Sequence, residues 1–285
     1  MKLRLLLCLL LVALLFPALA PAQQAQMQPL TFWYEYSINP GKDADFMELV
    51  KTVGQPVRDK LMADGVVLAW GLDVDLLRVP GFATHIIWVS VADYAGVEKV
   101  QAAMQAQIAK LDEEAGKAGM TKKGTKTAGV SERIRDISDV SKTRDYLTRD
   151  LIFKTGSGAP PAGLLPWTRF AFVKVKPGKG SEFRKAWEKY NMPVYDKLVA
   201  DGVILAYGLS IEEIRTAGEF THFTWFVTKN LGDMDKVRTA FLADRDRRSP
   251  EEQDAMTSMF NGLLDLDASR QEVTRSVIFK VGAMK

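Results

Sequence analysis

One segment of this sequence occurs twice. Residues 56–88 are PVRDKLMADGVVLAWGLDVDLLRVPGFATHIIW, and residues 193–225 are PVYDKLVADGVILAYGLSIEEIRTAGEFTHFTW. The offset of 137 residues holds without a gap from residue 40 to residue 100, where 24 of 61 positions are identical. Two copies this similar must be able to adopt the same fold, so the chain has to encode one arrangement of helices and strands twice.

Both copies predict the same order of elements. Apolar, β-branched runs ended by Gly or Pro predict strands, and apolar residues at helical spacing predict helices. In the first copy we expect strands over 30–38, 66–78, 83–91 and 146–154 and helices over 43–63 and 93–115. In the second copy we expect strands over 167–176, 203–215, 220–228 and 274–282 and helices over 180–201, 231–247 and from Ser249 onward. Ser249, with Glu252 three residues later, is typical of a capping box.

The first helix of each copy has the strongest support, because both copies place apolar residues at the same helical positions. These are Phe46, Leu49, Val50, Val53, Val57 and Leu61 in the first copy and Phe183, Ala186, Trp187, Tyr190, Val194 and Leu198 in the second. Pro56 and Pro193 fall inside this helix and should kink it, because proline has no amide hydrogen to donate.

The two copies define α+β repeats over 30–156 and 167–285, joined by a Gly- and Pro-rich linker over 157–166. Their closing segments, TRDLIFKTG at 148–156 and TRSVIFKVG at 274–282, match at an offset of 126. The first repeat is therefore longer by 11 residues. A Lys-rich stretch over 118–129 accounts for this difference, and we interpret it as a solvated insertion.

Residues 1–22 are typical of a signal peptide. Lys2 and Arg4 precede a short apolar run over 5–16, and small residues at 20–22 supply a cleavage site. We therefore expect an exported protein, periplasmic or extracellular, with no membrane contact after cleavage. An uncleaved anchor is the alternative.

Loss of this segment changes two inferences about partners and chemistry. The only cysteine, Cys8, is lost, so no disulfide and no thiol chemistry are expected. The formal charge falls from +3 to +1 with the loss of Lys2 and Arg4, which gives no argument for nucleic acid as a partner.

Each repeat has the order β-α-β-β-α-β, the split βαβ arrangement with helices on one face of a four-stranded antiparallel sheet. The entry Pro40-Gly41-Lys42 followed by Phe46, and the turn at Asp64-Gly65, make each repeat resemble the dimeric α/β-barrel superfamily. That group includes antibiotic-biosynthesis-type monooxygenases and chlorite-dismutase-like haem proteins. The resemblance implies two ferredoxin-like repeats packed sheet against sheet as a pseudo-dimer within one monomeric chain.

His85 and His222 are the only histidines and occupy equivalent positions in the two repeats. Side chains alternate across a strand, and the Thr/Trp face of these strands is the more consistently apolar. We therefore place both histidines on the side facing the other sheet, where an imidazole could transfer protons in catalysis. The alternative is a buried histidine that serves packing.

Several other residues are candidates for ligand binding. Glu35 is the acid of the first predicted strand and has Phe172 as its counterpart; it could pair with His85 or lie exposed on the sheet. Arg78 and Arg215 could bind a carboxylate, or form salt bridges at turns. Large aromatic surfaces that could line a ligand site or form the core are Trp70 and Tyr207, Trp88 and Trp225.

No cofactor is expected. One histidine per repeat and no retained cysteine leave too few ligands for a metal site. We expect no haem, because Thr-His-x-x-Trp places a bulky Trp on the same strand and nothing else marks a porphyrin pocket. Three functions stay open: binding of a small apolar molecule between the sheets, a cofactor-independent oxygenase-like enzyme using His85 or His222, and a scaffold without a ligand.

Overall fold

A computed structural model describes residues 28–118, 128–156, 161, 163–216, 218 and 220–282. Eight strands form one closed antiparallel barrel in the order β1-β3-β2-β8-β5-β7-β6-β4. The strands are β1 Leu30–Tyr36, β2 Val67–Asp75, β3 His85–Val91, β4 Arg144–Thr155, β5 Trp167–Val175, β6 Ile204–Glu212, β7 His222–Thr228 and β8 Leu264–Val281. The predicted signal peptide, most of the predicted Lys-rich insertion and half of the predicted linker lie outside the described residues.

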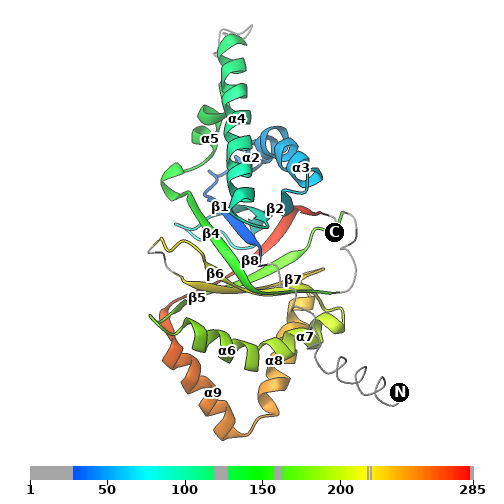
Figure 1. The fold of residues 1–285 in the computed structure, drawn as a ribbon, viewed down its shortest axis with the longest axis vertical. Helices are drawn as coiled ribbons and strands as arrows, with labels where there is room; N and C mark the ends of the chain where they lie inside the picture. The colour runs from blue at the N-terminus through cyan, green and yellow to red at the C-terminus, as the bar shows by residue number, and fades with distance from the viewer. Residues whose placement is uncertain are drawn as a thin grey trace, which may run out of the picture.

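Helices cover the barrel on two opposite sides (Figure 1). On one side lie α2 Asp43–Leu49, a π-helical turn Val50–Gly54, α3 Gln55–Ala63, α4 Tyr94–Ala118 and α5 Val130–Ile137, followed by a 3₁₀ turn Val140–Lys142. On the other side lie α6 Gly180–Tyr190, α7 Met192–Ala200, α8 Asp233–Asp246 and α9 Pro250–Leu263. The predicted α+β class is therefore confirmed.

The barrel joins the two halves of the chain at two seams. Residues 28–156, the N-terminal half, contribute the strand order β4-β1-β3-β2, and residues 163–282, the C-terminal half, contribute β8-β5-β7-β6. The seams are the β2–β8 and β4–β6 pairs, so the last strand of each half pairs with the second strand of the other. Neither half closes the barrel without the other.

Each half has its own apolar layer between the outer face of the sheet and its helices, here called the N-terminal and C-terminal outer layers. The predicted helical stripe lies in these layers, with Phe46 and Val53 buried in one and Phe183 and Trp187 in the other. The expected interruption is also present. Pro56 lies in the first turn of α3, after the π-helical turn, and α6 ends just before α7 begins.

β8 is longer than the sequence predicts. It begins at Leu264, ten residues before the expected start at Thr274. The extra residues pair with the end of β5, where Val175 opposes Leu264. This stretch is polar and exposed over much of its length, so it shows none of the continuous apolar character used to predict strands. The predicted capping box at Ser249 and Glu252 is confirmed at the start of α9.

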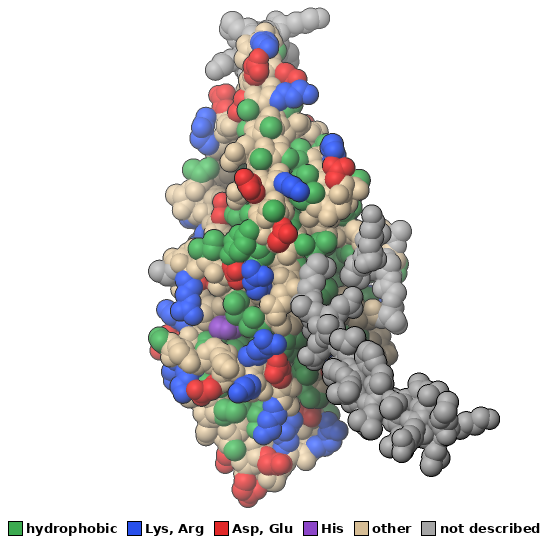
Figure 2. Space-filling view, viewed as in Figure 1, with side chains coloured by type: hydrophobic (Ala, Val, Ile, Leu, Met, Phe, Trp, Pro, Cys, Tyr) green, Lys and Arg blue, Asp and Glu red, His purple; other side chains and the backbone are tan. Residues whose placement is uncertain are grey.

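The surface carries both signs of charge. Figure 2 shows Lys and Arg interspersed with Asp and Glu over the projecting end of α4 and over the helices at the opposite end. In the described part of the chain, no helix combines the length and apolarity needed to cross a bilayer.

A substitution at Gly71 of β2 would test how tightly the barrel is packed. A Cβ at this position would lie 2.6 Å from Cζ2 of Trp88 and 2.7 Å from the carbonyl oxygen of Ile278. Gly71→Ala should therefore lower the free energy of unfolding by about 2–3 kcal/mol, because neither backbone nor a packed indole can move away easily. Denaturant unfolding measures this. Gly116→Ala, where a Cβ meets nothing within 4 Å, is the control and should leave stability equal or slightly higher. Equal stability of the two variants would contradict the expected clash.

Candidate functional site

Both histidines lie on the outer face of the barrel, beneath the helices. His85 begins β3, is 2% exposed, and packs edge-on against Phe46 of α2 with 5.1 Å between ring centres. His222 begins β7 and packs in the same way against Phe183 of α6 at 5.3 Å. The prediction that the histidines face the other sheet is therefore wrong.

The error has a physical reason, which is that both faces of these strands are apolar. The inner face of β3 carries Ile86 and Trp88, which join the ring cluster inside the barrel. The outer face carries Ile87 and Val89, which pack under the helices beside His85. In a barrel with helices outside it, an apolar face does not reveal which side it covers.

Each histidine has a threonine beside Nδ1. Thr84 Oγ1 lies 3.0 Å from His85 Nδ1, and Thr221 Oγ1 lies 2.9 Å from His222 Nδ1. Burial lowers the pKa of both imidazoles to about 4. Both histidines are therefore neutral at pH 7 and can accept a proton only at an energetic cost.

The two histidines differ at the other ring nitrogen. Asp43 Oδ1 lies 3.5 Å from His85 Nε2, and Asp43 also accepts a hydrogen bond from Arg78 at the surface. The residue equivalent to Asp43 in the second copy is Gly180, so His222 has no carboxylate there. Arg215, the equivalent of Arg78, is exposed. Arg78 thus forms the surface salt bridge that was the alternative to a ligand site.

The superfamily that the repeats resemble includes haem proteins, but neither histidine of this chain is placed to bind a haem iron. Both ring nitrogens of His85 already face protein groups, Thr84 and Asp43. The ring of Phe183 lies against His222. Two hollows of the described chain, one between α4 and strands β1 and β3 and one beside Arg135 of α5, have no histidine in their lining.

The interior of the barrel is packed with rings. Trp33 of β1 lies edge-on to Phe170 of β5 and to Phe223 of β7, at 5.6 Å from each ring centre. The buried residues of this cluster are Trp33, Ile86, Tyr146, Phe170, Phe172, Phe220 and Phe223, with Trp88 and Trp225 packed against them. The two sheets therefore meet ring to ring where the sequence predicted a ligand.

The predicted aromatic pairs separate into two places. Trp88 and Trp225 point into the barrel, whereas Trp70 and Tyr207 are fully buried in the two outer layers. Trp70 Nε1 donates to Asp59 at 3.1 Å.

An Asp–Ser–Trp set lies at each seam. At the β2–β8 seam Asp73 accepts from Ser276 Oγ at 2.7 Å and from Trp88 Nε1 at 3.2 Å. Thr274 Oγ1 lies 3.4 Å from the same carboxyl group. Burial raises the pKa of Asp73 to about 6.

At the β4–β6 seam the same three groups recur, but the aspartate lies on the last strand of its half and the serine on the second strand of the other half. Asp150 of β4 accepts from Ser210 Oγ of β6, and Trp225 Nε1 donates to that hydroxyl at 3.0 Å. Burial raises the pKa of Asp150 to about 7. By the sequence offsets Ser210 is the equivalent of Asp73, and Asp150 is the equivalent of Ser276.

Glu35 faces the barrel interior near one mouth and is 3% exposed. Its Oε1 accepts from the Tyr146 hydroxyl at 2.6 Å and lies 3.3 Å from Nη2 of Arg270. The Arg270 guanidinium lies over the ring of Phe172, the equivalent of Glu35, at 4.3 Å. Glu35 is thus neither exposed nor paired with His85, whose side chain lies on the opposite face of the sheet.

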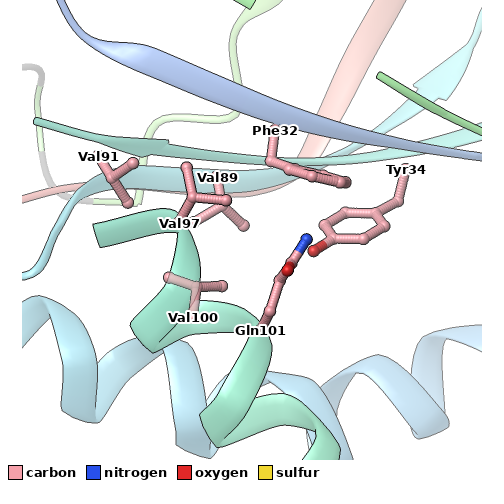
Figure 3. A pocket seen from close by; sticks show the side chains of 7 residues that line it. All are labelled: Phe32, Tyr34, Val89, Val91, Val97, Val100 and Gln101. Atoms are coloured by element: carbon pink, nitrogen blue, oxygen red, sulfur yellow. The ribbon is translucent and has the colours of Figure 1, made fainter. Parts of the chain in front are cut away.

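A crevice opens in the N-terminal outer layer, between α4 and strands β1 and β3. It leaves no space for a water molecule and is lined by Phe32, Tyr34, Val89, Val91, Val97, Val100 and Gln101. Figure 3 shows the Tyr34 hydroxyl and the Gln101 amide pointing toward one another beside the valines. The crevice is mainly apolar with two polar groups, which is the usual composition of a small-molecule site.

A second depression, of about 200 Å³, lies beside α5 among polar residues that include Asp112 and Arg135. It is open and borders the part of the chain outside the description, so we assign it no role.

Arg58 of α3 is a residue that sequence reasoning missed. It is 4% exposed, and its Nε and Nη1 atoms are buried without a hydrogen-bond partner in the described chain. The guanidinium lies 5.5 Å from the ring centre of Trp70 and occupies space that a Cβ at Gly54 would take, 2.1 Å from Nη1. The available clue was the exchange of Arg58 for Tyr195 in the second copy, inside an otherwise apolar stripe.

No family model matches the sequence, and no curated protein matches it. Solved structures do resemble this one. A "putative monooxygenase" from Fusobacterium nucleatum superposes with a TM-score of 0.57 at 13% identity, covering 90% of this chain and 95% of the other. A "putative monooxygenase" from Lactobacillus acidophilus gives 0.53 at 12%, covering 90% and 98%, and an anthrone oxidase-like protein gives 0.52 at 10%, covering 92% and 96%. The chain therefore has the dimeric α/β-barrel fold that its motifs predicted.

The exchanged seam residues allow a direct test. Asp73→Ser should lower the free energy of unfolding by about 1–3 kcal/mol, because the Trp88 and Ser276 donors lose their acceptor. Ser276→Asp should also destabilise, because it places two buried carboxyl groups together. The double variant recreates the arrangement of the other seam and should recover most of the loss. A double-mutant cycle by urea unfolding measures this coupling, and strictly additive losses would contradict it.

The histidines should make the fold sensitive to mild acid. Their pKa is about 4 when folded and about 6.5 when unfolded, so the unfolded state gains protons first. Their contribution is constant above about pH 6.5 and is lost as the pH falls toward 4. Asp73 and Asp150, whose pKa values are raised, act in the opposite direction, so variants must be compared with the parent at each pH.

His85→Phe and His222→Phe should each cost about 1–3 kcal/mol at pH 7.5, where the threonine partner is lost. This deficit should shrink toward pH 4.5, because the variant no longer has an imidazole to protonate on unfolding. Urea unfolding at both pH values measures it. A deficit of the same size at pH 7.5 and 4.5 would show that the histidine pKa values are not depressed by folding.

Proposed function

We propose that the protein binds a small, mainly apolar molecule in the crevice between α4 and the N-terminal sheet. The observation that supports this most directly is the lining, in which apolar side chains from β1, β3 and α4 surround the polar groups of Tyr34 and Gln101. This places the ligand outside the barrel, because rings fill the interior.

Binding requires α4 to move away from the sheet. The crevice has no room for even a water molecule while α4 stays in place, whereas sites for drug-sized ligands enclose roughly 300 Å³. Of the 25 residues of this helix, Gly96 and Val100 are fully buried, and Val97, Met104, Ile108 and Leu111 are partly buried against the N-terminal outer layer. Its far end projects beyond the body of the molecule (Figure 1). A shift of the first turns of α4 away from β1 and β3 would widen the crevice without disturbing the strand pairing of the barrel.

The wider biological setting is part of the same proposal. Two ferredoxin-like repeats packed as an internal pseudo-dimer account for the 137-residue repeat and for the matched strand orders of the two halves. A cleaved signal peptide over 1–22 would export the protein to the periplasm or beyond. The chain would then act as a monomeric exported binding protein.

An oxygenase-like enzyme is the second candidate. One observation favours it: His85 opposes Tyr36 in the β1–β3 pair, on the same outer face as Tyr34 of the crevice. The similar structures described as monooxygenase and anthrone oxidase-like agree with such chemistry but share only the fold. In this case His85→Phe would abolish turnover of a bound ligand while leaving its binding intact.

A substitution at the mouth of the crevice tests ligand binding. Gln101 is exposed, so Gln101→Trp can cover the opening without disturbing the core. A thermal-shift screen of small aromatic compounds should identify ligands that raise the melting temperature of the parent protein, and Gln101→Trp should weaken them at least tenfold. Arg238→Trp, the equivalent exposed position on α8, is the matched control and should leave binding unchanged. A ligand unaffected by Gln101→Trp would show that the crevice is not its site.

A further inference from the structure

The first turn of α2 places a carboxylate beside His85. Asp43 is the first residue of α2, and its Oδ1 atom lies 3.5 Å from His85 Nε2. The same oxygen accepts a hydrogen bond from Arg78, in the loop between β2 and β3. A helix N-terminus favours a negative charge, because its first amides have no carbonyl partner within the helix. The N-terminal half therefore holds a carboxylate among an imidazole, a guanidinium and a helix N-terminus.

The C-terminal half keeps these surroundings but lacks the carboxylate. At the offset of 137 residues the histidine and the arginine recur as His222 and Arg215, whereas Gly180 lies at the position of the aspartate. Gly180 is the first residue of α6. The first helical hydrogen bond is donated by the Phe183 amide and no side chain caps α6, so the amides of residues 180–182 have no acceptor in the described chain.

The His222 ring turns its Cε1–Nε2 edge toward Gly180. A Cβ built on Gly180 would lie 3.8 Å from both ring atoms and, apart from its neighbours in the sequence, would meet nothing else within 4 Å. This is ordinary contact, in contrast to the clash at Gly71. The start of α6 can therefore hold an additional group against the edge of the His222 ring.

Thr221 determines which nitrogen of His222 carries the hydrogen. The ring is 6% exposed, and Thr221 Oγ1 lies 2.9 Å from its Nδ1. The same hydroxyl oxygen accepts from the Val175 amide at 2.9 Å, and its own hydrogen has no other acceptor in the described chain. The hydroxyl therefore donates to Nδ1, which leaves the ring hydrogen on Nε2. A buried imidazole thus directs a donor without an acceptor at the start of α6.

The acids closest in the sequence are bound to other partners. Glu182 of α6 accepts from Lys179 at 2.8 Å. Glu213, in the loop that carries Arg215, accepts from Arg149 at 2.6 Å. Arg215 is exposed and has no hydrogen bond or ion pair within the described residues. No described acid therefore takes the part that Asp43 has in the other half.

We propose that the C-terminal half binds the carboxylate group of a small organic acid at the start of α6, where Gly180 replaces the aspartate. One oxygen of the acid accepts the hydrogen bond from His222 Nε2. Arg215 and the N-terminus of α6 supply the positive potential, since the imidazole is neutral at pH 7. The first half already holds a carboxylate among the same groups, which is why this class of anion is favoured. The site lies in the other half from the crevice, so it goes beyond the proposed function.

Acetate is the smallest probe of this class, and the imidazole C–H signals report its binding. The chain has only two histidines, so a His85→Phe variant assigns their NMR signals. Titration at pH 7 and constant ionic strength should shift the His222 signals and leave those of His85 in place, because Asp43 already lies there. Acetamide, similar in shape but uncharged, should bind roughly tenfold or more weakly. Arg215→Gln should weaken acetate binding by about threefold, because the charge it removes is exposed.

Two substitutions exchange the difference between the halves. Gly180→Asp supplies a carboxylate from the chain and should weaken acetate binding at His222 roughly tenfold or more, because like charges repel. Gly180→Ala adds only the Cβ and is the matched control, which should leave binding unchanged. Asp43→Gly should make the His85 signals respond to acetate as those of His222 do in the parent protein.

The contrary results are equally clear. If acetate shifts neither histidine, or shifts both alike in the parent protein, the difference between Gly180 and Asp43 creates no site. If acetate still binds to Gly180→Asp as it does to Gly180→Ala, it binds elsewhere and the assignment to α6 is wrong. These measurements do not involve Gln101→Trp, so this proposal and the crevice can each fail without the other.

Discussion

The rest of the barrel depends on the hydrogen bonds that two buried carboxyl groups accept, those of Asp73 and Asp150, one at each seam. Strands of the two halves pair only where β2 meets β8 and β4 meets β6, and each pair has a register shift beside its aspartate. A hydrogen-bonded aspartate fixes the register there, because a slip of one residue would leave a buried carboxyl group without its donors. The seams in turn hold Trp33 against Phe170, so the packed interior follows from them.

The exchange of strands between the two sets indicates what each seam requires. Each seam needs one carboxyl group, one hydroxyl group and one indole, and it does not matter which half supplies the acid. Two acids at one seam would repel, and two serines would leave an indole donor poorly satisfied. The aspartate and the serine of one seam can therefore be exchanged only together. This explains why the copies differ at these positions yet keep the same local chemistry.

Much of the fold could be predicted from the sequence because the repeat supplies two independent samples of one pattern. The stripe that contains Phe46 and Phe183 is apolar in both copies, so chance agreement was excluded and the helix was placed correctly. The inward or outward direction of a strand could not be predicted in this way. His85 lies between apolar neighbours on both sides, and only closure of the barrel decides which neighbours face the helices. β8 escaped prediction over 264–273 because pairing with β5, and no local propensity, makes it a strand.

The candidate site was hidden from sequence analysis for a related reason. A search for chemistry favours rare residues such as the histidines, which occur in both copies and have the same Thr and Phe neighbours. Features shared by both halves are those that the barrel itself needs. A ligand site can be built in one half without disturbing the other, so it should appear where the copies disagree. Two such differences between equivalent positions are Arg58 in the first copy against Tyr195 in the second, and Tyr34 against Ala171. Both fall within otherwise matching layers. In the C-terminal layer aromatic rings close the space, whereas in the N-terminal layer a buried charge and a narrow crevice remain. Duplication thus separates the two demands on the fold, because one half can keep the packing that the barrel needs while the other is free to carry the proposed binding site.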